Sequence, residues 1–384
     1  MSDPCEKIRE EVSTALKSVA GKIHDGEEED GVPHATKTVS TCLPDILDLA
    51  LTKTGHWTAC HRRKSVQILQ SIMELCAAAE LLLPRLADIH AKLCLGCHDD
   101  NDDVFDAAVA CAEALGRYGD DLSPSMKLIV PKLEGKESGY DTPRHIYANL
   151  VLLGSLVRGS GAEGEQMSCH VPPICAALKS IVVYNETCRS DVSVMETLLA
   201  VCQDMLHSSK TCFHIDAAST LSLLRCALQI QACPSEFGLK EGNAELLKGL
   251  SHLCCQEGDV TLLLRPHFSS LLASVTQDLT QENNFLWKTV DDDASNFRAF
   301  EALVSLSPRL AGENFVIDDG HGGVSPIVER HLAADAIPAV VLAMLGVLEQ
   351  MLSDPGCAPR LCSHAPRLVA RCILPNLVWK AGAV

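Results

Sequence analysis

Apolar residues recur at helical spacing along most of the chain, and residues 82–116 show this pattern most clearly. The stretch reads LLPRLADIHAKLCLGCHDDNDDVFDAAVACAEALG. An apolar helical pattern covers 82–95, a polar turn covers 99–103, and a second helical pattern starts at Val104. The spacing predicts a helix, an acidic turn and a second helix within about 35 residues.

The second helix of this unit has an apolar face and candidate boundary residues at both ends. Asp102 or Asp103 is placed to act as its N-cap by accepting free backbone N–H groups, and the helix could end at Gly116. Its apolar face has residues spaced 4, 3 and 4 positions apart, namely Val104, Ala108, Cys111 and Leu115. Two such helices cannot bury their apolar faces alone, so they need neighbours of the same kind.

The same helix–turn–helix pattern recurs along the chain. The periodicity predicts further helices at 43–51, 64–79, 126–133, 145–157, 170–183, 193–206, 218–230, 243–255, 265–275, 296–306, 338–352 and 364–379. A glycine-bearing loop at 312–326 interrupts the series, and DDDASNFRAFEAL (291–303) repeats the acidic turn. We count about eight helix pairs, which predicts an all-α solenoid of the HEAT or armadillo type. An irregular all-α domain is the alternative.

Proline spacing supports a repeat. Proline recurs in the first helix of successive units, 40, 47 and 41 residues apart and then after a further 94, at Pro44, Pro84, Pro131, Pro172 and Pro266. The last interval is two steps of 47, and HEAT and armadillo repeats have periods of about 40–47 residues. We expect these prolines inside the first helices, where neighbouring helices accommodate a kink.

Three segments follow from this reading. Residues 1–23 are expected to form an amphipathic helix, and residues 24–38, with the acidic run at 25–30, a flexible loop. Residues 39–384 are expected to form the solenoid. The last segment is a first-type helix with no second helix after it, which predicts an array that lacks its C-terminal repeats.

Composition favours helices packed on helices and narrows the range of partners. The chain of 384 residues is 47% hydrophobic but only 4% aromatic, whereas sheets favour aromatic and β-branched residues. The 32 basic residues are outnumbered by 50 acidic ones, which gives a formal net charge of −18. An acidic protein repels phosphate backbones and anionic lipid, so nucleic acid and membrane are disfavoured as partners and basic protein segments are favoured.

Cysteine usage and the N-terminal sequence predict a reducing cytosol. Many of the 19 cysteines fall on apolar helical faces, where a free thiol packs as a small hydrophobic group. The N-terminal sequence MSDPCEKIREEVS has no apolar signal region. The longest apolar run, 337–348, is too short to span a bilayer.

One stretch contains two possible metal or haem motifs. CLGCH (94–98) matches a c-type haem attachment pattern, and His90 extends it to H-x3-C-x2-C-H, a zinc-like set. Eight residues of straight helix span about 12 Å, which is too far for four ligands around one ion. We therefore predict that these side chains pack in the core, with haem and zinc as the alternatives.

Two other motifs are weak. DDNDDVFD (99–106) resembles a calcium loop, but Val104 and Ala110 stand where an EF-hand needs Gly and Glu. GSGAEG (159–164) matches G-x-G-x-x-G, but a helix precedes it where a dinucleotide site needs a strand.

The histidines at His207, His214, His252 and His267 have no paired nucleophile or carboxylate. We predict no catalytic residues, cofactor or metal; the sequence does not indicate which residues bind protein.

The unit at 82–116 resembles a HEAT repeat. The family pattern has Leu-Pro in the first helix, Asp in the turn and Val-Arg-x-Ala-Ala opening the second helix. The matching residues are Leu83, Pro84, Asp102, Val104, Ala107 and Ala108. Phe105 stands where the family usually has Arg, so the usual Arg–Asp tie between repeats lacks its Arg here.

A narrower resemblance covers roughly residues 40–384. SPSMKLIVPKL (123–133), YANLVLLGSLVRG (147–159) and above all ILPNLVWKAG (373–382) are similar to the C-terminal half of the HEAT-repeat axonemal dynein assembly factor family. This implies a cytoplasmic, non-enzymatic scaffold that helps assemble dynein heavy and intermediate chains alongside chaperones. A karyopherin-like transport adaptor and an enzyme on a helical frame are the alternatives.

Overall fold

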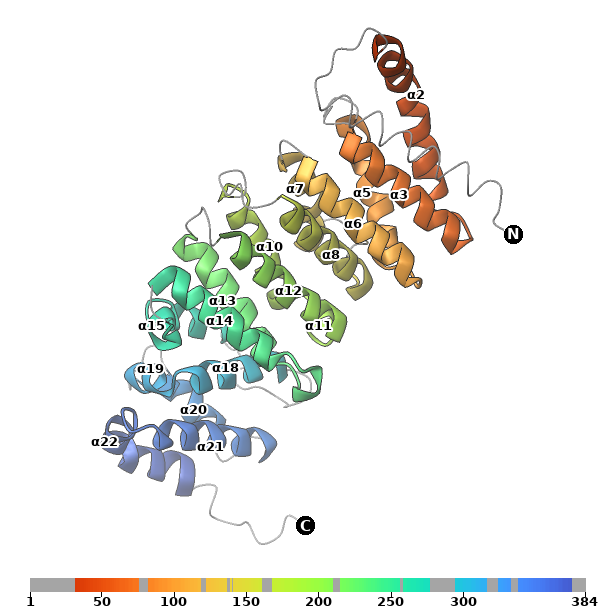
Figure 1. Ribbon diagram of the computed structural model, residues 1–384. Coiled ribbons are helices and arrows are strands. Elements are labelled where there is room, and N and C mark those ends of the chain that lie inside the picture. Colours follow the sequence, from red (N-terminus) through yellow and green to blue (C-terminus); the bar gives the residue numbers. More distant parts are fainter. Residues whose placement is uncertain are drawn as a thin grey trace, which may run out of the picture. The chain divides into compact units, whose positions relative to one another are not determined.

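A computed structural model describes residues 32–374 apart from 76–81, 119–121, 137–138, 140, 161–167, 210–214, 256–257, 277–293, 316–323 and 333–337. All regular secondary structure in this described part is helical, as expected for an all-α solenoid. The chain divides into two compact units, residues 1–214 and 215–384 (Figure 1). None of the described helices is both long and apolar enough to cross a membrane.

The first unit is a series of helix pairs. Its elements are α2 (Val32–Lys53), α3 (Ala59–Leu75), the 3-10 turn η1 (Leu83–Arg85), α5 (Leu86–Gly96), α6 (Asp102–Tyr118), α7 (Ser123–Leu133), α8 (Pro143–Gly159), α10 (Val171–Tyr184), α11 (Glu186–Arg189) and α12 (Val192–Ser209). The second helices α3, α6, α8 and α12 pack one on the next, and the first helices α5, α7 and α10 form a parallel layer beside them (Figure 1). This two-layer stacking of helix pairs is the arrangement that the repeat pattern predicts.

The second unit begins with α13 (Ala217–Gln231), which contacts α14, α16 and α18. Its further elements are η2 (Ser235–Phe237), α14 (Lys240–Cys255), α15 (Val260–Leu264), α16 (Phe268–Val275), α18 (Ala294–Leu306), α19 (Pro308–Glu313), α20 (Val324–His331), α21 (Pro338–Ser353), α22 (Ala358–Leu368) and the π-turn η3 (Val369–Ile373). α21 packs against α18, α19, α20 and α22. Helix-on-helix packing thus continues within this unit.

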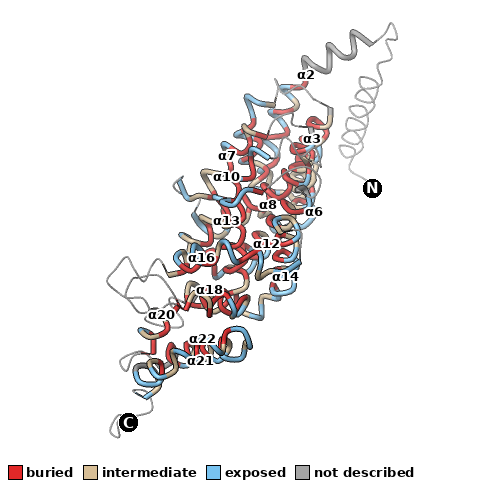
Figure 2. The backbone as a smooth tube through the Cα atoms, turned by 90° about the vertical axis from the view of Figure 1, so that its left-hand side faces the viewer, coloured by how far each residue is buried: buried red, intermediate tan, exposed pale blue. Residues whose placement is uncertain are grey.

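The core lies between the helices of each unit. In the first unit α8 is buried without interruption from Ala148 to Val157 because α6, α7 and α12 cover it (Figure 2). In the second unit α13 is buried from Ser222 to Ile230. Arg225 lies within that stretch and donates hydrogen bonds to Gln229 and Asn296. Amide oxygens therefore solvate a guanidinium that has no access to bulk water.

The apolar face expected for α6 is confirmed, but both expected boundaries of this helix are wrong. Val104, Ala108, Cys111 and Leu115 are all buried. The backbone carbonyl of Asn101 accepts the first helical hydrogen bonds, so Asp102 and Asp103 lie in the first turn and not at the N-cap. At the other end the helix continues through Gly116 to Tyr118.

Gly116 does not end α6 but lies where α6 crosses α8 at close range. A Cβ at Gly116 would overlap the carbonyl oxygen of Leu156 in α8. A Cβ at Gly159 would overlap the carbonyl oxygen of Glu113 in α6. The two glycines therefore let the backbones of α6 and α8 touch from both sides.

The N-terminal prediction needs a correction. Residues 24–38 were expected to form a loop, but α2 already begins at Val32. The expected helix at 1–23, the acidic run at 25–30 and the remainder of that loop lie outside the described residues.

The prolines do not all lie inside first helices as expected. Pro44 and Pro131 do lie inside α2 and α7. Pro84 lies in the 3-10 turn before α5, Pro172 in the first turn of α10, and Pro266 in the turn between α15 and α16. Proline fits the first turn of a helix but cannot donate the backbone hydrogen bond of a helix interior. Accordingly, α5 and α16 start two residues after their prolines, and α10 starts one residue before its proline.

Two further boundaries differ from expectation near the C-terminus. The interrupting loop was placed at 312–326, but α20 begins at Val324 and buries Val324 and Val328. The helix expected at 364–379 starts earlier, as α22 at Ala358. Just before it, the Asp354 carboxylate accepts the backbone N–H groups of Gly356 and Cys357. Residues 375–384 lie outside the described part.

Candidate functional site

The turns that join the paired helices of the first unit are tied to one another by side-chain contacts. We call the described residues of these turns, 54–58, 97–101, 134–136, 141–142 and 190–191, the turn edge. Arg144 at the start of α8 donates to the carbonyl oxygen of His98, 3.4 Å away. Asn185 donates to the carbonyl oxygen of Asp141 at 2.8 Å. Each tie crosses from one helix pair to a neighbouring one.

Arg62 makes the strongest of these ties. Its Nε and Nη2 donate to the two carboxylate oxygens of Asp99, at 2.6 and 2.7 Å. Its Nη1 donates to the carbonyl oxygens of His56 and Trp57. The guanidinium therefore fixes the α2–α3 turn, which carries the 87%-exposed Trp57, to the α5–α6 turn.

This pair has the geometry and burial of a stabilising ion pair. The Arg62 and Asp99 side chains are 22% and 10% exposed, and their contact is bidentate. Burial alone raises the pKa of the Asp99 carboxyl, but hydrogen bonds from Arg62 and from the backbone N–H of Asn101 outweigh it and leave the pKa below its usual value. An Arg–Asp tie between repeats therefore exists although Phe105 replaces the expected Arg; it uses an Arg from the preceding pair.

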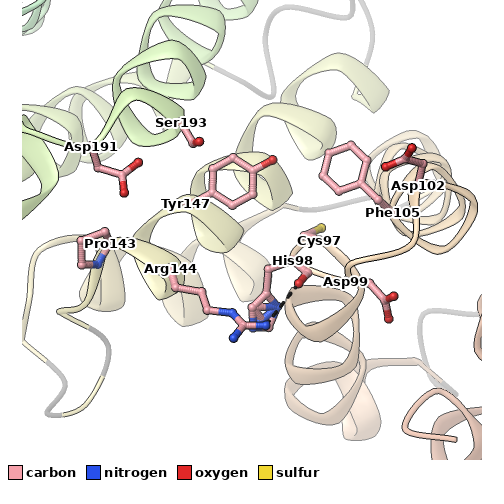
Figure 3. A pocket seen from close by; sticks show the side chains of 10 residues that line it. All are labelled: Cys97, His98, Asp99, Asp102, Phe105, Pro143, Arg144, Tyr147, Asp191 and Ser193. Carbon is pink, nitrogen blue, oxygen red and sulfur yellow. Dashed lines mark hydrogen bonds between the residues drawn. The ribbon is translucent and has the colours of Figure 1, made fainter. Parts of the chain in front are cut away.

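An open cavity of about 460 Å³ lies along the turn edge (Figure 3). Its lining comes from the α5–α6 turn, the start of α8 and the start of α12. The lining residues are Cys97, His98, Asp99, Asp102, Phe105, Pro143, Arg144, Tyr147, Asp191 and Ser193. Three successive helix pairs thus contribute to one site.

Local caps position the side chains that line this cavity. The Asp191 carboxylate accepts the backbone N–H of Val194 at 3.1 Å and so caps α12. Thr142 accepts the N–H of His145 and caps α8, which sets the direction of Arg144 and Tyr147 in the first turns of that helix. Because both caps fix helix ends, the cavity wall is held by rigid elements.

The middle of the cavity is aromatic and its ends are acidic. Figure 3 shows the rings of Phe105 from α6 and Tyr147 from α8 pointing toward one another. Asp102 and Asp191 lie at opposite ends of the view, with Arg144 and His98 along one side. Burial and the nearby Arg144 lower the pKa of His98, so its imidazole is neutral near pH 7.

The side chains of the haem-like and zinc-like motifs do not converge on a metal. His90 is 1% exposed and its Nε2 lies 3.0 Å from the hydroxyl of Ser125. The Cys94 thiol donates to the side-chain oxygen of Asn149. Burial raises the pKa of Cys94 to about 11 and raises that of Cys97 further, so both are thiols rather than metal-binding thiolates. In the described part of the chain no three His, Cys, Asp or Glu residues are grouped to hold a metal ion.

The remaining motifs also have structural roles. Of the calcium-like loop, Asp99 is held by Arg62, and Asp103 forms an exposed ion pair with Arg63 at 2.8 Å. Of the dinucleotide-like motif, Gly159 ends α8 against α6, and 161–167 lie outside the described residues. His207 and His267 lie in α12 and just before α16, with no nucleophile bonded to either ring among the described contacts.

Only part of the turn edge and its cavity is visible in the sequence. Cys97, His98 and Asp102 belong to the motifs described above, whereas no sequence motif contains Arg62 or marks Tyr147 as a site residue. Arg62 and Asp99 are 37 residues apart, close to one repeat, and Arg63 and Asp103 are 40 apart. An Arg and an Asp one repeat apart is therefore the signal that could have located these ties.

The comparison with known families decides the identity of the fold. The model of the dynein axonemal assembly factor 5 HEAT-repeat domain matches residues 35–234, more than half of the chain. The chain belongs to this family. Membership in the assembly factor family confirms the resemblance expected from the sequence and connects the chain with axonemal dynein assembly. The match does not include 373–382, the segment that carried most of the expected resemblance. No curated protein and no solved structure matches the chain.

Proposed function

We propose that this chain is a non-enzymatic, cytoplasmic scaffold that binds dynein heavy and intermediate chains, together with chaperones, during assembly of axonemal dynein. Family membership over residues 35–234 is the observation that carries the proposal. Stacked helix pairs support it because they present long rows of turns and helix faces to other proteins. The net charge of −18 favours client segments that are basic.

The turn edge of the first unit is the proposed client-binding surface. It combines a cavity of about 460 Å³, two facing aromatic rings and the exposed Trp57. Aromatic residues that become buried on binding and are surrounded by polar residues often dominate the binding energy of protein–protein interfaces. Because Arg62 holds the Trp57 turn to the next turn, this surface needs little reordering when a client binds.

Affinity capture tests this proposal. The tagged full-length chain is expressed in ciliating cells, and captured proteins are identified by mass spectrometry at low and at raised salt. We expect dynein heavy and intermediate chains with chaperones, and less of them as salt screens the acidic surface. Capture of a small GTPase and transport cargo without dynein chains would instead support a karyopherin-like adaptor.

A further inference from the structure

The cavity on the turn edge has the size and construction of a binding site. Its volume of about 460 Å³ falls within the range of small-ligand and side-chain pockets. Its walls come from α5–α6, α8 and α12, so it exists only when three successive helix pairs are stacked. A segment bound there would touch all three pairs at once.

The middle of the cavity suits an apolar side chain or the alkyl part of a basic one. Phe105 and Tyr147 are only partly buried and face one another across the space (Figure 3). The Tyr147 hydroxyl makes no hydrogen bond to any of the described residues, so it is available to a ligand. Aromatic faces pack against aliphatic chains and attract cations above the ring.

The charges around the cavity favour a basic ligand at its two ends. Asp99 is already neutralised by Arg62, and the His98 imidazole is neutral. The remaining charged side chains in the cavity lining are the carboxylates of Asp102 and Asp191 and the guanidinium of Arg144. The two carboxylates lie at opposite ends of the cavity, and Arg144 lies along one side of it (Figure 3). The Asp191 carboxylate uses one oxygen, Oδ1, to cap α12 at 3.1 Å, which leaves the other oxygen for a ligand.

We propose that this cavity binds an extended client segment of basic–apolar–basic character. The apolar side chain lies between Phe105 and Tyr147, and the two basic side chains extend toward Asp102 and Asp191. This inference deepens the proposed scaffold role and depends on it only for the identity of the client. It assigns client selection to the turns of the first unit instead of to its helix faces.

Fluorine NMR on the full-length chain tests the inference directly. The chain has four tyrosines, so 3-fluorotyrosine labelling gives four signals, and Tyr147→Phe assigns the one in the cavity. The probe is the acetylated and amidated peptide Gly-Ser-Lys-Leu-Lys-Ser-Gly. We expect it to shift the Tyr147 signal to saturation and to leave the other three unchanged. Peptides with Glu for both Lys, or with Ser for Leu, should shift the Tyr147 signal at least fivefold less at equal concentration.

Charge variants test the two ends of the cavity. Asp102→Asn with Asp191→Asn removes both carboxylates and keeps the α12 cap, because Asn caps helices as well as Asp does. Each exposed ion pair contributes a few-fold in affinity, so we expect the double variant to bind the Lys-Leu-Lys peptide about five- to tenfold more weakly. Asp106→Asn removes one negative charge from an exposed position on α6 outside the cavity and should change affinity less than about twofold.

Three results would overturn the inference. These are no shift of the Tyr147 signal by the Lys-Leu-Lys peptide, an equal shift by the Glu peptide, or equal affinity in the double variant and Asp106→Asn. Circular dichroism melting of each variant confirms that the fold is kept. If the peptide fails while the full-length chain still captures dynein chains, the inference fails and the scaffold proposal stands.

Discussion

At the scale of single residues, the charged ties between neighbouring repeats are ion pairs between residues about one repeat apart in sequence. Arg62–Asp99 is the most buried example on the turn edge. Arg158 extends the same principle to the second helices, where it binds Glu113 of α6 and Asp204 of α12 at 2.8 and 2.6 Å. The two residues of each of these ion pairs are 37 to 46 positions apart in the sequence. Arginine suits this role because its rigid fork can hold two partners at once.

Replacing Arg62 by Lys should destabilise the protein, because an ammonium group cannot keep both bonds to Asp99 and the bonds to two carbonyl oxygens. We expect the free energy of unfolding in urea to fall by about 1–3 kcal/mol. Arg63→Lys is the matched control. The Arg63 and Asp103 side chains are 37% and 65% exposed, so its cost should stay below about 0.5 kcal/mol. Equal losses in both variants would contradict the assigned role of Arg62.

His90 should make stability depend on pH below neutrality. Desolvation, with a smaller effect of Lys132, lowers the pKa of His90 to about 4, whereas an unfolded chain has a His pKa of about 6.5. Between these values the unfolded chain binds a proton that the folded chain does not, so stability is full above about pH 6.5 and falls toward pH 4. The loss reaches about 3 kcal/mol at the lower end.

The measurement is the free energy of unfolding in urea at pH 7 and pH 4.5, for the parent chain and His90→Gln. Gln cannot take up the proton, so the variant should lose less stability than the parent between the two pH values. The difference between the two proteins at pH 7 serves as the baseline. An identical pH dependence in both would show that His90 is protonated in the folded state.

The sequence predicts correctly which residues are buried where helical periodicity alone determines the buried face. It fails where the role of a residue depends on a partner from another helix. The buried face of α6 followed from periodicity alone. The roles of Gly116 and Asp99 did not, because Gly116 meets a backbone carbonyl of α8 and Asp99 meets an Arg of α3. The cavity was also beyond sequence reasoning, since its lining depends on the side-chain directions of three turns.

At the scale of elements, α6 and α8 cross with their backbones in direct contact. Gly116 and Gly159 each face a carbonyl of the opposite helix, and Arg158 bridges the same two helices next to them. Backbone contact of this kind tolerates no side chain. The crossing therefore fixes how two successive repeats stack.

Alanine at Gly116 or Gly159 should destabilise the protein by about 1–3 kcal/mol, because the helices must separate to admit a methyl group. Gly346 in α21 is the control, since a Cβ there meets nothing within 4 Å. Gly346→Ala should stabilise by up to about 1 kcal/mol through helix propensity alone. Thermal melting and urea unfolding measure both. Stabilisation by all three substitutions would show that α6 and α8 do not touch as described.

Truncating Leu115 in α6 or Leu303 in α18 to Ala should cost about 2–5 kcal/mol each, because both side chains are buried and the substitution leaves a cavity. Leu342 on α21 is 70% exposed and provides a matched substitution with a cost below about 0.5 kcal/mol. Costs near zero at Leu115 and Leu303 would contradict the assigned helix register.

Helices were predictable from sequence, whereas several of their ends were not. Periodicity located every long helix of the first unit, but Pro84 and Pro266 moved helix starts because neither can donate to a helical hydrogen bond. The short helix α20 was missed although Val324, Val328 and Leu332 are buried at a spacing of four. The apolar pattern of α20 covers only two helical turns and follows a glycine-rich sequence, so the periodicity was too short to indicate a helix.

At the scale of the whole molecule, repeated helix pairs, an acidic surface and family membership converge on protein binding. The match to the assembly factor family covers residues 35–234, which includes the entire cavity and all of its ties. The family match connects the chain with dynein assembly, and the scaffold role is our proposal for how it acts.

The most direct measurement is recovery of dynein assembly in ciliating cells depleted of the endogenous protein. Cytoplasmic extracts are separated by sedimentation after the full-length chain is returned, and dynein heavy and intermediate chains are followed across the gradient. The account predicts that the returned chain restores their co-sedimentation as one complex. Dynein chains that stay in separate fractions despite normal levels of the returned protein would contradict it.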